Sequence, residues 1–227
     1  MVIDSSIMKR ILIALVAAVC SLTAVMGQES EKTVIWGVRA GIDVNIPGKW
    51  HGNGASVDMF KNGCGFTAGA VCNVWLGRGF YLEPGLSLFY DTYSFDDLIL
   101  ADNAGEPAQT DPSLYKVGLR LPVMVGYSFN IAQRLLMSVY TGPELSYAFG
   151  GKVRLDENVD TNDIDTAFDL FGPGGQRRLD CAWKIGVAAP IGPISMSLDC
   201  ALGLTNLNRS EMSFREYRVT VGATYYF

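Results

Sequence analysis

The feature of this sequence that most limits its fold is an alternation of apolar residues with small or polar ones, repeated in eight separate runs. Successive side chains of a β-strand point to opposite faces, so each run predicts a strand whose two faces differ in chemistry. In the run from Tyr115 to Phe129 every odd-numbered residue is aliphatic or aromatic, and the run from Arg215 to Phe227 alternates in a similar way. No stretch with a helical period competes with these runs, which indicates an all-β chain.

The eight runs recur along most of the chain. They span residues 34–42, 66–76, 80–90, 115–129, 135–149, 180–187, 194–204 and 215–227. The pattern fits a soluble sandwich or lipocalin-like barrel, whose apolar face points inward. It also fits a membrane barrel, whose apolar face meets lipid while its polar face fills the lumen. Three observations favour the membrane barrel.

First, the polar face is rich in glycine, which weakens strands and is a poor choice for a surface that faces water. Ten glycines fall on it: Gly37, Gly41, Gly69, Gly85, Gly118, Gly126, Gly142, Gly186, Gly203 and Gly222. A small barrel needs small residues beside large ones to fill its interior, so these glycines favour an enclosed polar face.

Second, the charges of the polar face balance, as they must where charged groups are buried. Five basic residues are matched by five acidic ones: Arg39, Lys116, Arg120, Lys184 and Arg218 against Glu83, Glu144, Asp180, Asp199 and Glu216. We interpret these ten residues as a structural charge network in the lumen. The alternative is that they line a gated path for a small apolar solute.

Third, aromatic residues gather near both ends of the runs, as expected where a barrel meets the two membrane interfaces. One rim is predicted to carry Tyr90, Tyr115, Tyr147, Phe149 and Phe214. The other is predicted to carry Phe80, Tyr127, Phe129, Tyr225 and Phe227.

The connections between runs alternate between long and short. Residues 44–64, 91–113 and 150–179 form long connections, residues 77–78, 130–134 and 190–192 form short ones, and residues 205–213 are intermediate. Outer-membrane barrels have short periplasmic turns and long extracellular loops. The sequence therefore predicts an eight-stranded antiparallel up-and-down transmembrane β-barrel. The first strand is predicted to begin, and the last strand to end, on the periplasmic side. Eight strands leave an interior that side chains can fill, so no open pore is expected.

The first 27 residues have the features of a cleavable signal peptide. Lys9 and Arg10 precede an unbroken apolar run, 11–19, and small residues follow before Gln28. We place the cleavage before Gln28 and the barrel domain at residues 28–227. A retained membrane anchor and a lipoprotein modified at Cys20 are alternatives, but the apolar run is short for a span and Val19 is bulky for a lipoprotein site.

The composition excludes some classes of function. Without residues 1–27 the chain has 16 basic and 22 acidic side chains, a net charge of −6, and no basic patch suited to nucleic acid. Four cysteines remain, Cys64, Cys72, Cys181 and Cys200, with no metal-type spacing. We interpret the last three as small apolar residues on a strand face, and their disulfide state stays open.

Several short motifs resemble those of a known family. They are Gly37–Gly41 in the first run, Gly65–Gly69 in the second, Tyr81–Leu86 in the third, Leu119–Val123 in the fourth and Tyr140–Glu144 in the fifth. In these motifs the chain is similar to the small outer-membrane barrels of Bacteroidetes, the PorT-like group. The resemblance covers the whole mature chain. It implies an outer-membrane barrel, and for some members a link to protein secretion or its assembly.

Catalytic and metal-binding signals are weak, so a non-enzymatic role in the cell envelope is predicted, without cofactor. His51 is the only histidine, with Ser56 nearby, and both are predicted to lie outside strands. An outer-membrane lipid-modifying enzyme is the least favoured alternative. The acidic residues of 156–169 could bind a divalent cation but are interpreted as a solvated loop. Expected partners are membrane lipid and lipopolysaccharide, the barrel assembly machinery, and an envelope or secretion protein.

Overall fold

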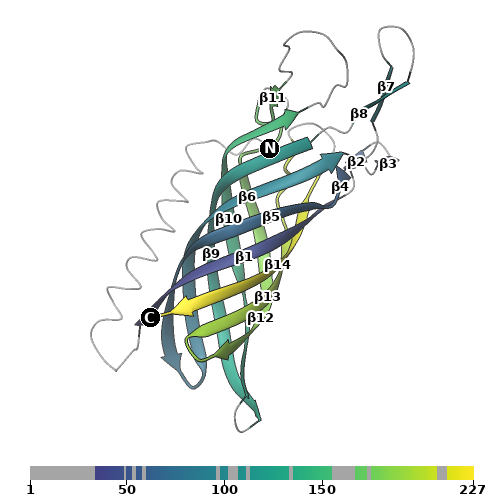
Figure 1. Ribbon diagram of the computed structural model, residues 1–227. Helices are drawn as coiled ribbons and strands as arrows, with labels where there is room; N and C mark the ends of the chain where they lie inside the picture. The colour runs from purple at the N-terminus through teal and green to yellow at the C-terminus, as the bar shows by residue number, and fades with distance from the viewer. Residues whose placement is uncertain are drawn as a thin grey trace, which may run out of the picture.

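Eight long strands close into a single barrel in the computed structural model (Figure 1). The structure describes residues 34–48, 50–52, 55–57, 60–95, 98–101, 107–110, 113–132, 135–154, 167–172, 175–208 and 214–227. The barrel strands are β1 (Val34–Pro47), β5 (Gly63–Gly77), β6 (Phe80–Phe95), β9 (Ser113–Ala132), β10 (Leu135–Arg154), β12 (Leu179–Ile191), β13 (Ile194–Gly203) and β14 (Glu216–Tyr226). In the described part of the chain, no helix has the length and apolarity to cross a membrane.

Each barrel strand pairs antiparallel with the next, and β14 pairs with β1 to close the ring. Following partners once around from Gly126 of β9 leads back to β9 at Lys116. The path is Gly126, Tyr140, Gly186, Asp199, Thr220, Asp43, Gly65, Asp91, Lys116. The shift of ten residues is the shear of the barrel. With eight strands it implies a tilt of about 40° and a radius of about 8 Å.

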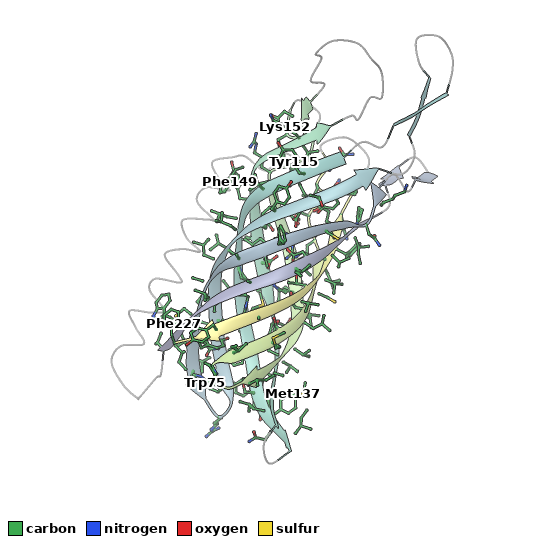
Figure 2. The ribbon with its side chains drawn as sticks, viewed as in Figure 1. Trp75, Tyr115, Met137, Phe149, Lys152 and Phe227 are labelled. Atoms are coloured by element: carbon green, nitrogen blue, oxygen red, sulfur yellow. The ribbon has the colours of Figure 1, made fainter. Side chains whose placement is uncertain are left out.

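The two faces of the strands differ as the alternation predicts. Side chains on one face are exposed, such as Ile185 at 52% and Leu198 at 49%, whereas on the other Met124 and Thr224 are each 1% exposed. The exposed face is apolar and points away from the barrel (Figure 2). The predicted eight-stranded transmembrane barrel is therefore confirmed, with its apolar face outward.

Outward aromatic rings form a belt near each end of the barrel. The rings of Tyr90 and Tyr115 lie 6.0 Å apart near one end, and those of Phe80 and Tyr127 lie 4.8 Å apart near the other. Tyr115 and Tyr127 both lie on β9, and their twelve-residue separation corresponds to roughly 30 Å along the barrel axis. One predicted belt residue was wrong: Phe214 is only 2% exposed, because the chain before β14 turns in over the barrel mouth.

The walls of the barrel have unequal heights. β9 and β10 each have 20 residues, whereas β13 has 10, and the longer strands project both at the end that carries the long connections and at their own short turn (Figure 1). We call β6, β9 and β10 the tall wall. β4 (Phe60–Lys61) pairs with β6 and β11 (Ala167–Asp169) pairs with β10, so both short strands widen the tall wall.

The long connections also contain short strands that the alternation did not predict. β2 (Trp50–Gly52) pairs with β3 (Ala55–Val57), and β7 (Leu98–Ala101) pairs with β8 (Pro107–Thr110). The prediction that His51 and Ser56 lie outside strands was wrong, since they are cross-strand partners in the first ribbon. The sequence feature that indicates this ribbon is Asn53-Gly54, a dipeptide that favours a two-residue hairpin turn.

The short connection after β5 has a well-defined backbone. Arg78 and Gly79 have φ angles of 54° and 87°, and positive φ at both central residues is what a type I′ hairpin turn requires. Such a turn matches the right-handed twist of the strands that it joins. Glycine meets the requirement without strain, whereas Arg78 is an L-residue in the left-handed region.

Candidate functional site: the ion-paired lumen

The candidate functional site is the barrel interior, where inward side chains from all eight strands meet. Nine of the ten residues proposed for the lumen network make an ion pair there: Arg39, Glu83, Lys116, Arg120, Glu144, Lys184, Asp199, Glu216 and Arg218. These residues come from strands far apart in sequence, so the closed ring is what brings them together.

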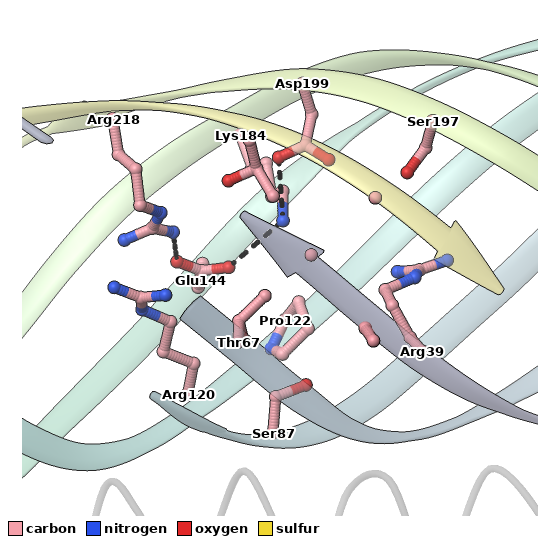
Figure 3. A pocket seen from close by; sticks show the side chains of 14 residues that line it. Arg39, Thr67, Ser87, Arg120, Pro122, Glu144, Lys184, Ser197, Asp199 and Arg218 are labelled. Atoms are coloured by element: carbon pink, nitrogen blue, oxygen red, sulfur yellow. Dashed lines mark hydrogen bonds and ion pairs between the residues drawn. The ribbon is translucent and has the colours of Figure 1, made fainter. Parts of the chain in front are cut away.

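At the centre, Glu144 lies between two cations (Figure 3). It accepts hydrogen bonds from the Arg218 guanidinium and from Lys184 Nζ, the latter at 3.5 Å. Lys184 Nζ also lies 2.9 Å from Asp199 Oδ1, and the Tyr140 hydroxyl donates to Asp199 Oδ2 at 3.0 Å. Each charge of this cluster is matched by a partner of opposite sign, as burial in a narrow lumen demands.

Arg120 links two carboxylates that the sequence reasoning missed. Its two terminal nitrogens donate to Asp43 Oδ2 at 2.5 Å and to Asp91 Oδ2 at 2.6 Å. Thr220 donates to the other oxygen of Asp43 at 2.6 Å, and Asp43 is fully buried. With these two added, the described lumen holds seven acidic and five basic residues, so the predicted balance of five against five was wrong.

Two further pairs lie on either side of the centre. Arg39 donates to Glu83 Oε1 at 2.5 Å, and the Tyr226 hydroxyl donates to Glu83 Oε2 at 2.6 Å. Toward the long-loop end, Lys116 Nζ lies 2.5 Å from Glu216 Oε2.

Asp180, the tenth predicted member, lies apart from the network. Within the described residues its carboxylate has no ion pair within 4.0 Å, and its buried Oδ1 has no hydrogen-bond partner. It borders a small cavity together with Asp91, Lys116 and Glu216. That cavity gives the carboxylate space for solvent.

An apolar cluster lies at each end of the network. Near the short turns, Tyr81, Met124 and Tyr140 pack together, with Trp75 and Ala188 against them. Near the long loops, the buried cluster consists of Phe89, Tyr93, Leu114, Ala148, Leu170 and Phe171. The lumen is therefore filled with side chains along its length, apolar at both ends and ionic between them.

Two loop segments cover the mouth at the long-loop end. They are residues 170–172 with 175–178, after β11, and residues 204–208 with Phe214, before β14. Arg177 N donates to the Leu207 carbonyl at 2.8 Å, and Leu207 N donates to the Phe214 carbonyl at 2.9 Å, so the segments hold each other in place. The Arg178 guanidinium lies 4.7 Å from the Phe171 ring centre. We refer to these two segments as the cap.

Little free space remains inside. A central cavity lined by Arg39, Glu144 and Pro122 and an upper one lined by Asp91 and Phe171 leave about 20 Å³ and 30 Å³ in which a water molecule could be centred. One water needs about 10–15 Å³, so each cavity has room for one to three waters. The described lumen is thus a packed interior and offers no continuous aqueous path.

Chemistry other than ion pairing is weakly represented. No group of three or more His, Cys, Asp or Glu residues among those described is arranged to hold a metal ion. Most of the acidic loop, and the predicted signal peptide at residues 1–27, lie outside the described residues. The four later cysteines are free, with Cys64 and Cys200 exposed on the outer face.

Fold and site together define a class: a small transmembrane β-barrel with a filled, ion-paired lumen. The family model for the outer membrane protein beta-barrel domain matches residues 26–209. The chain belongs to that family, which places it in the bacterial outer membrane.

Similar solved structures are distant. The attachment invasion locus protein Ail of Yersinia pestis, in complex with a heparin analogue, is 11% identical with a TM-score of 0.43, over 86% of this chain and 99% of Ail. Neisserial surface protein A is 13% identical with a TM-score of 0.41, over 85% and 97%. OprG of Pseudomonas aeruginosa is 11% identical with a TM-score of 0.40, over 86% and 97%. No curated protein matches the sequence.

Proposed function

We propose that this protein is a non-enzymatic, non-conducting barrel of the outer membrane that acts through its extracellular side, by binding a protein or lipopolysaccharide of the cell envelope. The observation that carries the proposal is the filled lumen, with paired charges at the centre and an apolar cluster at each end. A barrel that conducts no solute along its axis acts through its surfaces.

The tall wall adds support. The strands β6, β9 and β10 extend beyond the outer aromatic belt, and the chain carries its long connections at that end. Long loops on a rigid barrel are the usual location of binding residues. The motif resemblance to the PorT-like group of Bacteroidetes suggests a partner from protein secretion or its assembly.

Two measurements test the proposal. In planar bilayers the folded protein is expected to give no steady ion conductance. Crosslinking in intact envelopes is expected to capture a specific partner through positions on the tall wall. The test variant carries a photoreactive residue at Lys152, which is exposed beyond the belt. The matched control carries it at Arg78, in a short turn at the other end of the barrel. Capture of the same partner at both positions, or steady conductance, would contradict the proposal.

A second candidate function is transport of small apolar solutes, and one observation favours it: three neighbouring strands of the barrel wall carry a proline at the same level. Uptake is then expected to fall when Glu144 or Arg120 is changed, because both hold the lumen in shape. The third alternative, a lipid-modifying enzyme, predicts that His51→Ala abolishes a change in the lipid A profile of cells that make the protein.

A further inference from the structure

The hydrogen-bonded ladder of the barrel lapses at one level in three successive strand pairs. Among the described strands, and apart from bulges, residues lack a pairing partner in three places: Cys72–Asn73 against Glu83–Pro84, Gly85–Leu86 against Leu121–Pro122, and Gly142–Pro143 against Val123–Met124. We call this set of lapses the seam. It crosses β5, β6, β9 and β10 and leaves the other barrel strands fully paired.

Proline explains each lapse. Pro84, Pro122 and Pro143 lie on neighbouring strands, one in each interrupted pair, and proline has no N–H to donate to a ladder. Central strands rarely carry proline for this reason. Three of them side by side concentrate the missing bonds in one place, although the same residues scattered around the ring would leave every strand pair almost complete.

The seam lies inside the hydrocarbon layer of the membrane. Pro84 is the direct partner of Val123 on β9, and Pro143 falls opposite the same residue. Val123 lies eight residues from Tyr115 and four from Tyr127 of that strand, inside the hydrocarbon layer and nearer the belt at the short-turn end. The backbone groups freed by the prolines therefore face neither aqueous phase.

The wall is thin at this level. Gly85 and Gly142 are inward positions that place no side chain in the lumen, and a Cβ on Gly85 would lie 3.2 Å from both Pro122 and Val71. The inner lining beside them has both apolar and polar side chains: Val71 and Met124 are each 1% exposed, and Asn73, Glu83 and Lys184 are also buried there. Pro122 also borders the central cavity (Figure 3). An apolar chain that parted the strands beside Gly85 and Gly142 would meet Val71, Pro122 and Met124, whereas the interruption between β5 and β6 leads to Asn73 and Glu83.

We propose that the seam is a lateral portal, through which a hydrocarbon chain or an apolar solute dissolved in the bilayer reaches the lumen beside Met124. Both axial ends of the lumen are closed, by the cap with its apolar cluster and by the Tyr81–Tyr140 cluster, so the interrupted wall is the weakest barrier around the interior. Strand separation breaks existing hydrogen bonds elsewhere in the ring. At the seam those bonds are already missing, which lowers the free-energy cost of opening.

The portal is tested by the reactivity of a cysteine placed behind it. In a background without the native cysteines, Met124→Cys is compared with Ser197→Cys in phosphatidylcholine vesicles. Ser197 is also inward and buried, lies at a similar depth, and belongs to β13, whose pairing runs unbroken from Ile194 to Leu202. N-cyclohexylmaleimide, which partitions into the bilayer, is expected to label Met124→Cys at least tenfold faster, with the outward Leu198→Cys as the reference for full access.

Restoring the missing donors provides the second arm. Pro84→Val and Pro143→Val each return a backbone N–H to the ladder, and their outward side chains leave the lumen volume unchanged. Each is expected to lower Met124→Cys labelling toward the Ser197→Cys rate, and Pro190→Val, beside the short turn before β13, is the matched control with no effect.

Three results would overturn the portal. They are equal labelling of the two inward cysteines, unchanged labelling after donor restoration in folded protein, and faster labelling of Met124→Cys by a charged maleimide, which indicates an axial route. If a proline variant does not fold, as judged by migration of unboiled sample, the comparison of Met124→Cys with Ser197→Cys decides alone. The outcome is separable from the proposed function, since conductance and crosslinking do not depend on the seam.

Discussion

At the scale of single residues, the lumen depends on pairing more than on the number of charges. Glu144 is 1% exposed and lies between Arg218 and Lys184. Removing one partner of a buried ion pair leaves the other charge uncompensated, which costs about 3–5 kcal/mol. Asp180 carries the same charge in the same lumen without an ion pair, so the two carboxylates separate the effect of pairing from the effect of burial.

Glu144→Gln is therefore expected to lower the free energy of unfolding by about 3–5 kcal/mol. Asp180→Asn, its matched control, should change the same quantity by less than about 1 kcal/mol, because the amide keeps the shape and breaks no ion pair. Urea titration of the folded protein in lipid vesicles measures both. Equal losses of unfolding free energy in the two variants would show that the lumen charges stabilise the barrel through their summed electrostatic potential and not through specific ion pairs.

The missed residues show where residue-level prediction stops. Alternation placed Arg120 correctly inside the barrel, and the same alternation continues through Asp43 and Asp91, past the points where the predicted strands ended. The predicted runs ended at residues 42 and 90, one residue before each aspartate, whereas β1 continues to Pro47 and β6 to Phe95. Which acid pairs with which base could not be read from sequence, because partners are set by the ten-residue shear of the closed ring.

At the scale of elements, the hairpin between β5 and β6 depends on one backbone conformation. Gly79 has a φ of 87°, and a Cβ there would lie 2.7 Å from the Ser128 carbonyl oxygen. Gly150 offers a contrast, because the nearest atom to its Cβ position is 4.0 Å away. The first glycine is required by its conformation and its neighbour, whereas the second has room for a methyl group.

We expect Gly79→Ala to destabilise the barrel by about 1–2 kcal/mol, from strain in the left-handed region and the carbonyl contact. Gly150→Ala should leave stability within about 0.5 kcal/mol of the wild type. The midpoints of thermal migration shift on gels, read for both variants under one detergent, provide the comparison. A larger loss of stability for Gly150→Ala than for Gly79→Ala would mean that the turn tolerates a backbone conformation other than type I′.

The cap is a second element with a testable role. Phe171 packs with Phe89, Tyr93 and Leu114 below it and lies under the Arg178 guanidinium. Phe171→Ala should open the mouth, so that a charged, water-soluble thiol reagent reaches Ser146→Cys at least tenfold faster. Phe149→Ala, which removes an outward ring of the belt on β10, is the control and should leave the rate unchanged. No change in either variant would show that another part of the chain closes the lumen.

Elements differ in how much of them the sequence predicted. The barrel strands were predicted because alternation over eight or more residues is typical of a strand with two unlike faces and rare in any other structure. The ribbon of β2 and β3 was missed, since three-residue strands carry too little alternation and only the Asn53-Gly54 turn marked it. The inward position of Phe214 was also missed. The sequence pattern of an aromatic residue beside a strand end is the same whether the ring lies in the belt or fills the barrel mouth.

At the scale of the whole molecule, every conclusion depends on which face of the sheet meets lipid. The tryptophans report on this directly, since they lie on both faces. Trp183 points outward on β12 and is 42% exposed, at a depth near the membrane centre. Trp75 packs inside against Tyr81, with ring centres 5.9 Å apart. An inverted barrel would exchange these two environments while keeping the same strands and the same register.

Single-tryptophan variants that retain Trp183 or Trp75 therefore test the orientation in full. In vesicles of phosphatidylcholine brominated along its acyl chains, Trp183 fluorescence is expected to fall severalfold, because bromine must contact the indole to quench it. Trp75 should keep most of its emission at every bromine depth, since β-strand backbone separates it from the lipid. A water-soluble quencher such as acrylamide should affect neither strongly, one ring being in hydrocarbon and the other in the packed lumen. Stronger bromine quenching of Trp75 than of Trp183 would reverse the faces, and with them the enclosed ion-pair network.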